Sequence, residues 1–188
     1  MKDYAELLEC IVQYFKYEKI NIVAHSMGGV IAILLAIMHP QLINQLILAE
    51  AIINPQNAKI SRDIVAYGNE QKFSENYDRF IERFNKPNKK ISYQYYLTLL
   101  RCPSFVVFRS AKSLLSTIKP PFYEKFLHLP MPRFYLLGSK SYYTLSIEEK
   151  EEFLKNNIPI YEVSNAGHSM MIENPDAFYS KVAKIMQV

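Results

Sequence analysis

The sequence has only two cysteines among its 188 residues, Cys10 and Cys102, and they lie far apart. Two cysteines without a characteristic spacing argue against a disulfide framework and against a metal site. We therefore expect a reducing, cytoplasmic environment. The amino terminus is mixed in charge and lacks the layout of a secretory signal. The longest uninterrupted apolar run, residues 30–38, is too short to cross a bilayer. We therefore expect neither a membrane span nor a metal.

The sequence also lacks a strong overall charge, with a net charge of +4. Its basic residues nevertheless gather in the middle, because residues 55–130 hold 13 Lys and Arg against 6 Asp and Glu. A solvated basic face on a helical insertion explains this asymmetry, and attraction of an anionic partner or substrate is the alternative. No recognised motif accompanies the basic residues, so the sequence predicts no nucleic-acid binding.

Short apolar runs alternate with helical patterns outside this middle segment. Such alternation predicts a parallel sheet with helices on both faces. Pro40 ends one predicted helix, and Asn174-Pro175 opens the last one. The predicted strands lie near residues 19–25, 46–50, 133–138 and 158–163, and further helices cover residues 4–15 and 147–154.

Residues 55–130 show helical spacing and no alternation typical of strands. Aromatic and aliphatic residues at helical intervals predict helices over residues 73–84 and 93–100. We therefore interpret residues 55–130 as a helical cap, inserted into a core formed by residues 1–54 and 131–188. Its Tyr, Phe and Leu side chains either pack the cap itself or favour an apolar acyl or aromatic substrate.

The most informative motif is Ala24-His25-Ser26-Met27-Gly28-Gly29, between a predicted buried strand and a predicted buried helix. A serine on such a sharp turn is typical of a nucleophile elbow, which exposes Oγ at the carboxyl edge of the sheet. We expect the strained turn to need small residues at Ala24 and Gly28. The amide of Met27 points where an oxyanion would form.

A serine hydroxyl becomes nucleophilic only when a base takes its proton, so the motif predicts a histidine partner. Four histidines are available. His25 flanks the nucleophile and is expected to point away from it, whereas His39 ends a helix and His128 is expected on the surface. His168 follows the last predicted strand, in Asn165-Ala166-Gly167-His168, and is the predicted base.

These two segments resemble the α/β-hydrolase superfamily. Residues 24–29 match its G-x-S-x-G elbow except at the first position, and residues 165–175 resemble its final G-H…E-x-P segment. The resemblance implies half of a doubly wound α/β sheet, about four parallel strands, with a helical cap insertion. It implies Ser26 as nucleophile, His168 as base, a small-molecule acyl substrate and no cofactor.

The acid of the expected triad departs from the usual pattern of that family. Most members carry an aspartate after the strand that follows the cap, where this sequence has Gly138-Ser139-Lys140-Ser141. Some relatives place the acid one strand earlier, and Glu50 occupies that position. A glutamate ending a buried strand is costly unless it is paired, so we predict that Glu50 binds His168. A carboxylate that reaches solvent or a helix N-terminus is the alternative.

The family pattern also places several strands before the elbow, together with a loop that supplies a second oxyanion donor. The sequence shows neither, so the strand at 19–25 is expected to be an apolar edge open to self-association or to a complementing chain. Three functions follow: a serine hydrolase acting on carboxylic esters, a truncated and catalytically silent remnant or binding module, and a carrier-directed esterase or thioesterase. The carrier-directed function is favoured only by the positive charge of the cap.

Overall fold

The computed structural model describes residues 1–141 and 145–187, and the chain forms two compact units. The sheet unit comprises Met1–Asn57 and Ile118–Val188, and the helical unit comprises Ala58–Thr117. Residues 55–57 and 118–130, assigned to the insertion from sequence, group with the sheet unit. For residues 118–130 the reason lies in α8 (Phe122–Leu127), where the fully buried Phe126 packs its ring against Phe153, with 5.7 Å between centroids.

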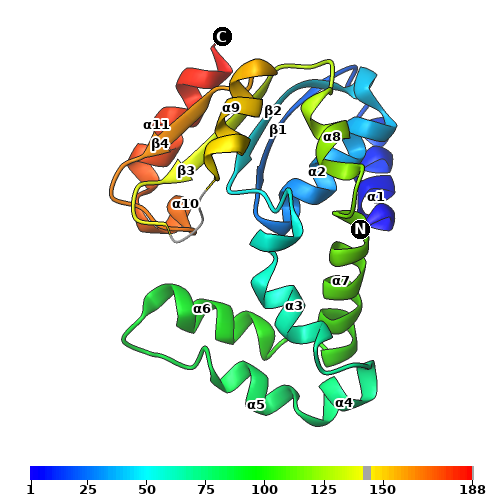
Figure 1. The fold of residues 1–188 in the computed structure, drawn as a ribbon, viewed down its shortest axis with the longest axis vertical. Helices are drawn as coiled ribbons and strands as arrows, with labels where there is room; N and C mark the ends of the chain where they lie inside the picture. Colours follow the sequence, from blue (N-terminus) through cyan, green and yellow to red (C-terminus); the bar gives the residue numbers. More distant parts are fainter. Residues whose placement is uncertain (142–144, 188) are drawn as a thin grey trace. The chain divides into compact units, whose positions relative to one another are not determined.

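The sheet unit is built on four parallel strands, which lie in chain order (Figure 1). Each strand is short and rich in β-branched or aromatic residues, as buried parallel strands are. The fold class expected from the sequence is therefore confirmed. The strands are β1 (Ile20–His25), β2 (Ile43–Ala49), β3 (Arg133–Gly138) and β4 (Ile160–Val163).

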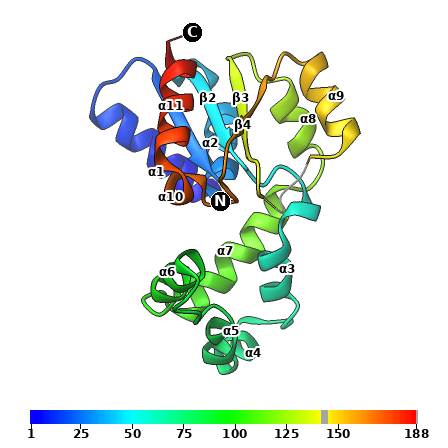
Figure 2. The ribbon, with the colours of Figure 1, turned by 90° about the vertical axis from the view of Figure 1, so that its left-hand side faces the viewer.

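Helices cover both faces of this sheet. Successive side chains of a strand point to opposite faces, so the apolar residues of β3 must be covered on both sides. Phe134 and Leu136 join a buried cluster with Val182 of α11 (Pro175–Met186). Tyr135, between them, packs against Phe153 of α9 (Ile147–Lys155), with ring centroids 5.3 Å apart. Figure 2 shows α11 on one side of the strands, and α8 and α9 on the other.

The helix after the elbow, α2 (Met27–Met38), is apolar on all sides and largely buried, as such a composition requires. It packs against α1 (Lys2–Tyr14), which buries Ala5 and Val12. The apolar stripe predicted along α1 is only partly covered, since Leu7 is 56% and Ile11 is 44% exposed.

The helical unit has a core of its own, centred on Phe73, Phe80 and Phe108. The Phe73 ring lies 5.2 Å from that of Phe80 and 5.8 Å from that of Phe108. These aromatic side chains therefore pack the unit itself. Its helices are α3 (Lys59–Val65), α4 (Glu70–Glu75), α5 (Tyr77–Glu82), α6 (Lys90–Leu99) and α7 (Ser104–Thr117).

The single helix predicted over residues 73–84 is wrong, because two short helices meet at Asn76. The Asn76 side chain donates to the Lys72 carbonyl at 2.9 Å. Asparagine competes in this way with the backbone pattern of a helix and favours its end.

The remaining short elements are α10 (Met170–Glu173) and the 3-10 turns η1 (Pro40–Leu42) and η2 (Pro55–Asn57). No described helix is both long and apolar enough to span a membrane.

Candidate active site

Ser26 lies in a strained turn between β1 and α2. Its φ is 53°, in the left-handed region that residues other than glycine rarely adopt. The turn is held by main-chain bonds on both sides: the Ser26 N–H donates to the Ala49 carbonyl at 3.1 Å, and the Ser26 carbonyl accepts from Gly29 at 3.0 Å and from Ile52 at 3.3 Å. A serine kept in such a conformation by its surroundings is typical of a functional turn.

The packing around this turn requires a small residue at Gly29 and not at Gly28. A Cβ at Gly29 would lie 2.3 Å from the Cβ of Ala51, whereas a Cβ at Gly28 would meet nothing within 4 Å. The expectation that Gly28 must be small is therefore not met. Close packing of α2 against the chain after β2 is what requires Gly29.

His168 lies in the loop between β4 and α10, with 24% of its side chain exposed. Its Nε2 is 3.2 Å from Ser26 Oγ, so the structure brings together the predicted nucleophile and base across 142 residues. Of the other three histidines, His39 and His128 lie elsewhere. His39 pairs with Glu9 at 3.0 Å, and His128 bonds the Glu124 carbonyl at 2.7 Å.

Glu50 completes the constellation from the end of β2. Its side chain has no exposed surface, and its Oε2 lies 2.7 Å from His168 Nδ1. Oε1 accepts from the Gly138 N–H at 2.9 Å, and Oε2 accepts from the Ser141 hydroxyl at 2.8 Å. Three donors around one buried carboxylate offset the cost of removing it from water.

The hydrogen-bond directions follow from this arrangement. An ionised carboxylate accepts and does not donate, so His168 carries its proton on Nδ1 and donates it to Glu50. The Nε2 lone pair is then left to accept from the Ser26 hydroxyl. This is the protonation state in which an imidazole can act as a base toward a serine.

Ser141 has a role that sequence reasoning missed. It stands where the family resemblance would place the acid, yet its hydroxyl donates to the carboxylate of Glu50, which comes from the neighbouring strand. The signal in the sequence was a hydroxyl at the position where most members of the family carry their acid.

The loop that carries His168 is tied down by Glu173. One carboxylate oxygen accepts from the Gly167 N–H at 2.9 Å, and the other accepts from the Ser169 N–H at 3.0 Å. The amides on either side of His168 are therefore held by one side chain. The loop also bonds the turn after β3, since the Lys140 N–H donates to the Ala166 carbonyl at 2.8 Å.

His25 also contacts this loop, and sequence reasoning did not foresee it. Its Nε2 lies 2.8 Å from the His168 carbonyl oxygen, and the two imidazole rings are 4.5 Å apart, centre to centre. Burial, followed by the nearby His168, holds the pKa of His25 below its usual value. No local pattern could reveal a contact across 143 residues.

Met27 is the first residue of α2, so its N–H has no carbonyl partner within the helix. Its side chain is 39% exposed. The amide stands at the positive end of a 12-residue helix, where developing negative charge is favoured.

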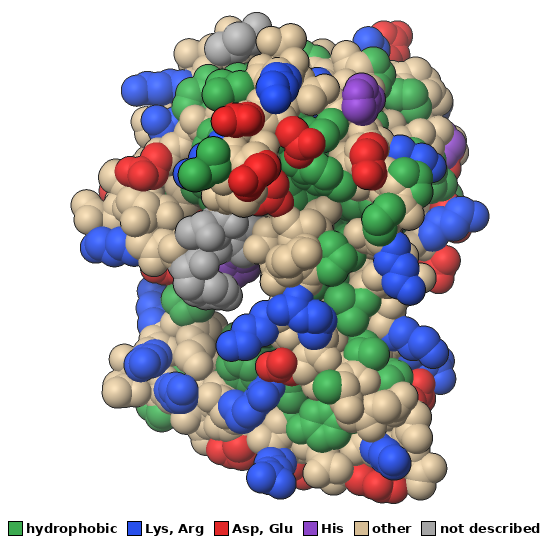
Figure 3. Space-filling view, viewed as in Figure 1, with side chains coloured by type: hydrophobic (Ala, Val, Ile, Leu, Met, Phe, Trp, Pro, Cys, Tyr) green, Lys and Arg blue, Asp and Glu red, His purple; other side chains and the backbone are tan. Residues whose placement is uncertain are grey.

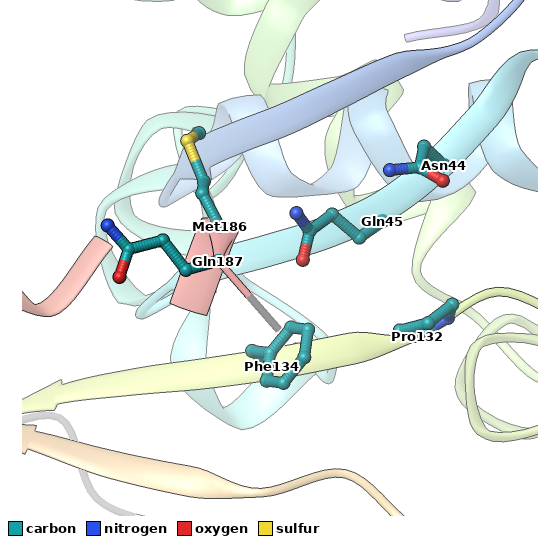
Figure 4. A pocket seen from close by; sticks show the side chains of 6 residues that line it. All are labelled: Asn44, Gln45, Pro132, Phe134, Met186 and Gln187. Atoms are coloured by element: carbon teal, nitrogen blue, oxygen red, sulfur yellow. The ribbon is translucent and has the colours of Figure 1, made fainter. Parts of the chain in front are cut away.

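A cavity of about 350 Å³ lies elsewhere in the sheet unit, at the amino ends of β2 and β3 (Figure 4). Ser26, Glu50 and His168 instead follow the carboxyl ends of their strands, where open α/β sheets bind ligands. Among the residues that the structure describes, no group of three or more His, Cys, Asp or Glu could hold a metal ion. The cavity is lined by Asn44, Gln45, Pro132, Phe134, Met186 and Gln187.

Four parallel strands flanked by helices, with a strained serine turn between β1 and α2, are the features of an α/β fold of the hydrolase type. The sequence model of the alpha/beta hydrolase fold matches residues 1–145. The chain belongs to this family. The search of curated proteins found no match.

Solved structures with the same fold include esterases. The chain resembles an esterase from Exiguobacterium antarcticum (TM-score 0.73, 17% identity, 98% of this chain and 72% of that one). A carboxylesterase structure from Nitrososphaera gargenis gives a TM-score of 0.71 at 17% identity, over 98% and 71% of the two chains. MenH from S. aureus gives 0.71 at 19% identity, over 99% and 75%. At such identities these similarities establish the fold.

Proposed function

We propose that this protein is a serine hydrolase that cleaves carboxylic esters or related acyl compounds through Ser26, His168 and Glu50. The observation that carries the proposal is the continuous chain of contacts, from Ser26 Oγ to His168 Nε2 at 3.2 Å and from His168 Nδ1 to Glu50 at 2.7 Å. Membership of the alpha/beta hydrolase fold family and the esterases among the similar structures support it.

In this mechanism Ser26 Oγ attacks the acyl carbonyl while His168 Nε2 takes the hydroxyl proton. His168 then gives that proton to the departing alcohol, and an acyl-enzyme remains on Ser26. A water molecule, deprotonated by His168, attacks the acyl-enzyme and releases the acid. Glu50 holds the imidazole in the required tautomer and stabilises the imidazolium formed in each half-reaction.

The Met27 N–H serves as an oxyanion donor in the same proposal. The tetrahedral intermediate places negative charge beside the start of α2, where the amide and the helix dipole both stabilise it.

The helical unit is proposed to be a cap, as the sequence suggested, but its buried aromatic residues do not select the substrate. They pack against one another, as Phe73, Phe80 and Phe108 do. The carrier-directed alternative rests on the positive charge of this segment alone. Figure 3 shows Lys and Arg side chains spread over this unit with acidic and apolar ones among them, and Arg109 is paired with Glu70 at 2.7 Å.

A fluorophosphonate probe tests the proposal, because it reacts covalently with an activated serine. We expect the purified chain to be labelled at Ser26 and to hydrolyse p-nitrophenyl acetate. Ser26→Ala is expected to abolish labelling and to lower kcat by at least about 10³-fold.

Ser74→Ala is the matched control, since Ser74 is an exposed serine of the helical unit. It is expected to behave as the wild type. A folded wild-type sample that takes up no label would overturn the hydrolase proposal in favour of a catalytically silent member of the family.

A further inference from the structure

His25 is the last residue of β1 and directly precedes Ser26, yet its side chain is engaged with the opposite end of the chain. Its Nε2 lies 2.8 Å from the carbonyl oxygen of His168, and its ring lies against the His168 ring at 4.5 Å and an interplanar angle of 47°. One imidazole therefore contacts both the main chain and the side chain of the other.

The protonation state of His25 follows from its partner. A carbonyl oxygen only accepts, so Nε2 of His25 carries a proton and donates it. Burial lowers the pKa of His25, and the nearby His168 lowers it further, so both favour the neutral ring. A neutral neighbour leaves His168 free to become charged during a reaction.

Other contacts hold the rest of the His168 loop. Glu173 binds the amides of Gly167 and Ser169, and Glu50 binds Nδ1 of the His168 ring. The His25 contact adds the His168 carbonyl and the His168 ring to this set. The distance of 3.2 Å from His168 Nε2 to Ser26 Oγ depends on how firmly the His168 peptide and ring are oriented.

We propose that His25 is a positioning residue for the reaction at Ser26: its Nε2–H anchors the His168 carbonyl, and its ring fixes the plane of the His168 imidazole. This inference rests on the proposed function of Ser26 and His168. His25 would then act on the reaction indirectly, by orienting the proposed base, His168.

Two substitutions separate the hydrogen bond from the ring. His25→Phe keeps a ring but has no donor, and His25→Gln keeps a donor at a similar distance from the backbone. We expect His25→Phe to lower kcat for p-nitrophenyl acetate by about 10²-fold with KM within about threefold, because positioning acts on the reacting geometry. We expect His25→Gln to recover kcat to within about fivefold of the wild type. His128→Phe is the matched control, since it removes another imidazole that bonds a carbonyl, and it is expected to leave kcat unchanged.

Full activity of His25→Phe, with an unaltered pH profile of kcat/KM, would overturn the inference, as would a His25→Gln variant as slow as His25→Phe. Fluorophosphonate labelling of the wild type tests the proposed function separately. A wild type that takes up no label shows that Ser26 is not an activated nucleophile, whereas a labelled wild type with a fully active His25→Phe variant rejects only the positioning role of His25. Nitrogen-15 NMR of the wild-type imidazoles tests which ring nitrogen of His25 carries the proton. It needs neither an activity assay nor a folded variant. A proton on His25 Nε2 at pH 7 is the expected result, and an Nδ1–H tautomer, whose Nε2 has no proton to donate, rejects the inference.

Discussion

Glu50 is a charged side chain with no exposed surface, and its surroundings explain how that is tolerated. The carboxylate accepts from an imidazole, a hydroxyl and a main-chain amide, all within 2.9 Å. Its φ of 43° places it in the left-handed region, as at Ser26. Two residues with strained backbones thus directly follow neighbouring strands and contact the same histidine, and strain of this kind gathers at functional sites.

Glu50→Gln is predicted to lower kcat by about 10³- to 10⁴-fold, because an amide presents an N–H to His168 Nδ1 and turns the imidazole into the wrong tautomer. Ser141→Ala removes one of three donors and is expected to lower kcat by less than about tenfold. Steady-state kinetics on p-nitrophenyl acetate measures both. The reverse order of the two effects would show that Glu50 is not the acid.

The two glycines that follow Ser26, Gly28 and Gly29, form a matched pair with opposite expected effects on stability. Gly29→Ala is predicted to lower the free energy of unfolding by about 1–3 kcal/mol, because the new Cβ would lie 2.3 Å from that of Ala51. Gly28→Ala, in open space within α2, is predicted to raise it by up to about 1 kcal/mol, because alanine favours helices. Urea denaturation measures both changes, and equal stabilities would contradict the packing argument.

At the scale of elements, the site is assembled by the turns that follow β1, β2, β3 and β4. Parallel strands bring their carboxyl ends to one edge of a sheet, so residues distant in sequence meet there. The turn after β3 bonds the loop after β4 through Lys140 and Ala166, and a Cβ at Gly138 would lie 2.5 Å from the carbonyl oxygens of Ala166 and Gly167. The loop that carries His168 is therefore shaped by its neighbour as well as by its own residues.

Glu173→Gln tests the hold on this loop. An amide keeps one acceptor oxygen but turns an N–H₂ group toward the other main-chain donor, so one of the bonds to Gly167 and Ser169 is lost. The free energy of unfolding is expected to fall by about 1–3 kcal/mol. Hydrogen exchange at the Gly167 and Ser169 amides is expected to accelerate.

Glu162→Gln provides the comparison, because Glu162 is an exposed glutamate of β4. If exchange at the two amides is unchanged in Glu173→Gln, or accelerates equally in both variants, the carboxylate does not hold the loop.

At the scale of the whole molecule, β1 pairs only with β2 among the strands that the structure describes. Apolar side chains on this strand and on α1 remain accessible, with Val23 39%, Leu7 56% and Ile11 44% exposed. An open apolar strand edge favours pairing with another chain. We therefore expect the isolated protein to self-associate through β1.

Val23→Lys is predicted to weaken this association, because a charge on an edge strand opposes pairing. Sedimentation velocity over a range of protein concentrations measures it, with Tyr179→Lys as control, since Tyr179 is a 59% exposed apolar residue of α11. A protein that stays monomeric throughout, or that responds equally to both substitutions, would show that β1 is not the contact.

Much of this arrangement could be read from local patterns. The strand ranges and the turn at Ser26 depend on residues close in sequence, and the alternation of strands and helices allowed the parallel sheet to be predicted. The contacts among Ser26, His168 and Glu50 were also anticipated, and their catalytic roles stay a prediction. The division of the helix at Asn76 was missed, because a side-chain bond to Lys72 overrides the helical spacing there.

The fold family, the sharp turn at Ser26 and the histidine after the last strand could be predicted from the sequence, because each is encoded by a short segment with its own periodicity and turn chemistry. The surroundings of that histidine depend instead on how the chain packs. The support of Ser141 for Glu50, the hold of Glu173 on the loop and the contact of His25 with His168 all require specific atomic positions. Residues up to 143 positions apart meet there, and packing, not local propensity, sets which of their donors and acceptors face one another.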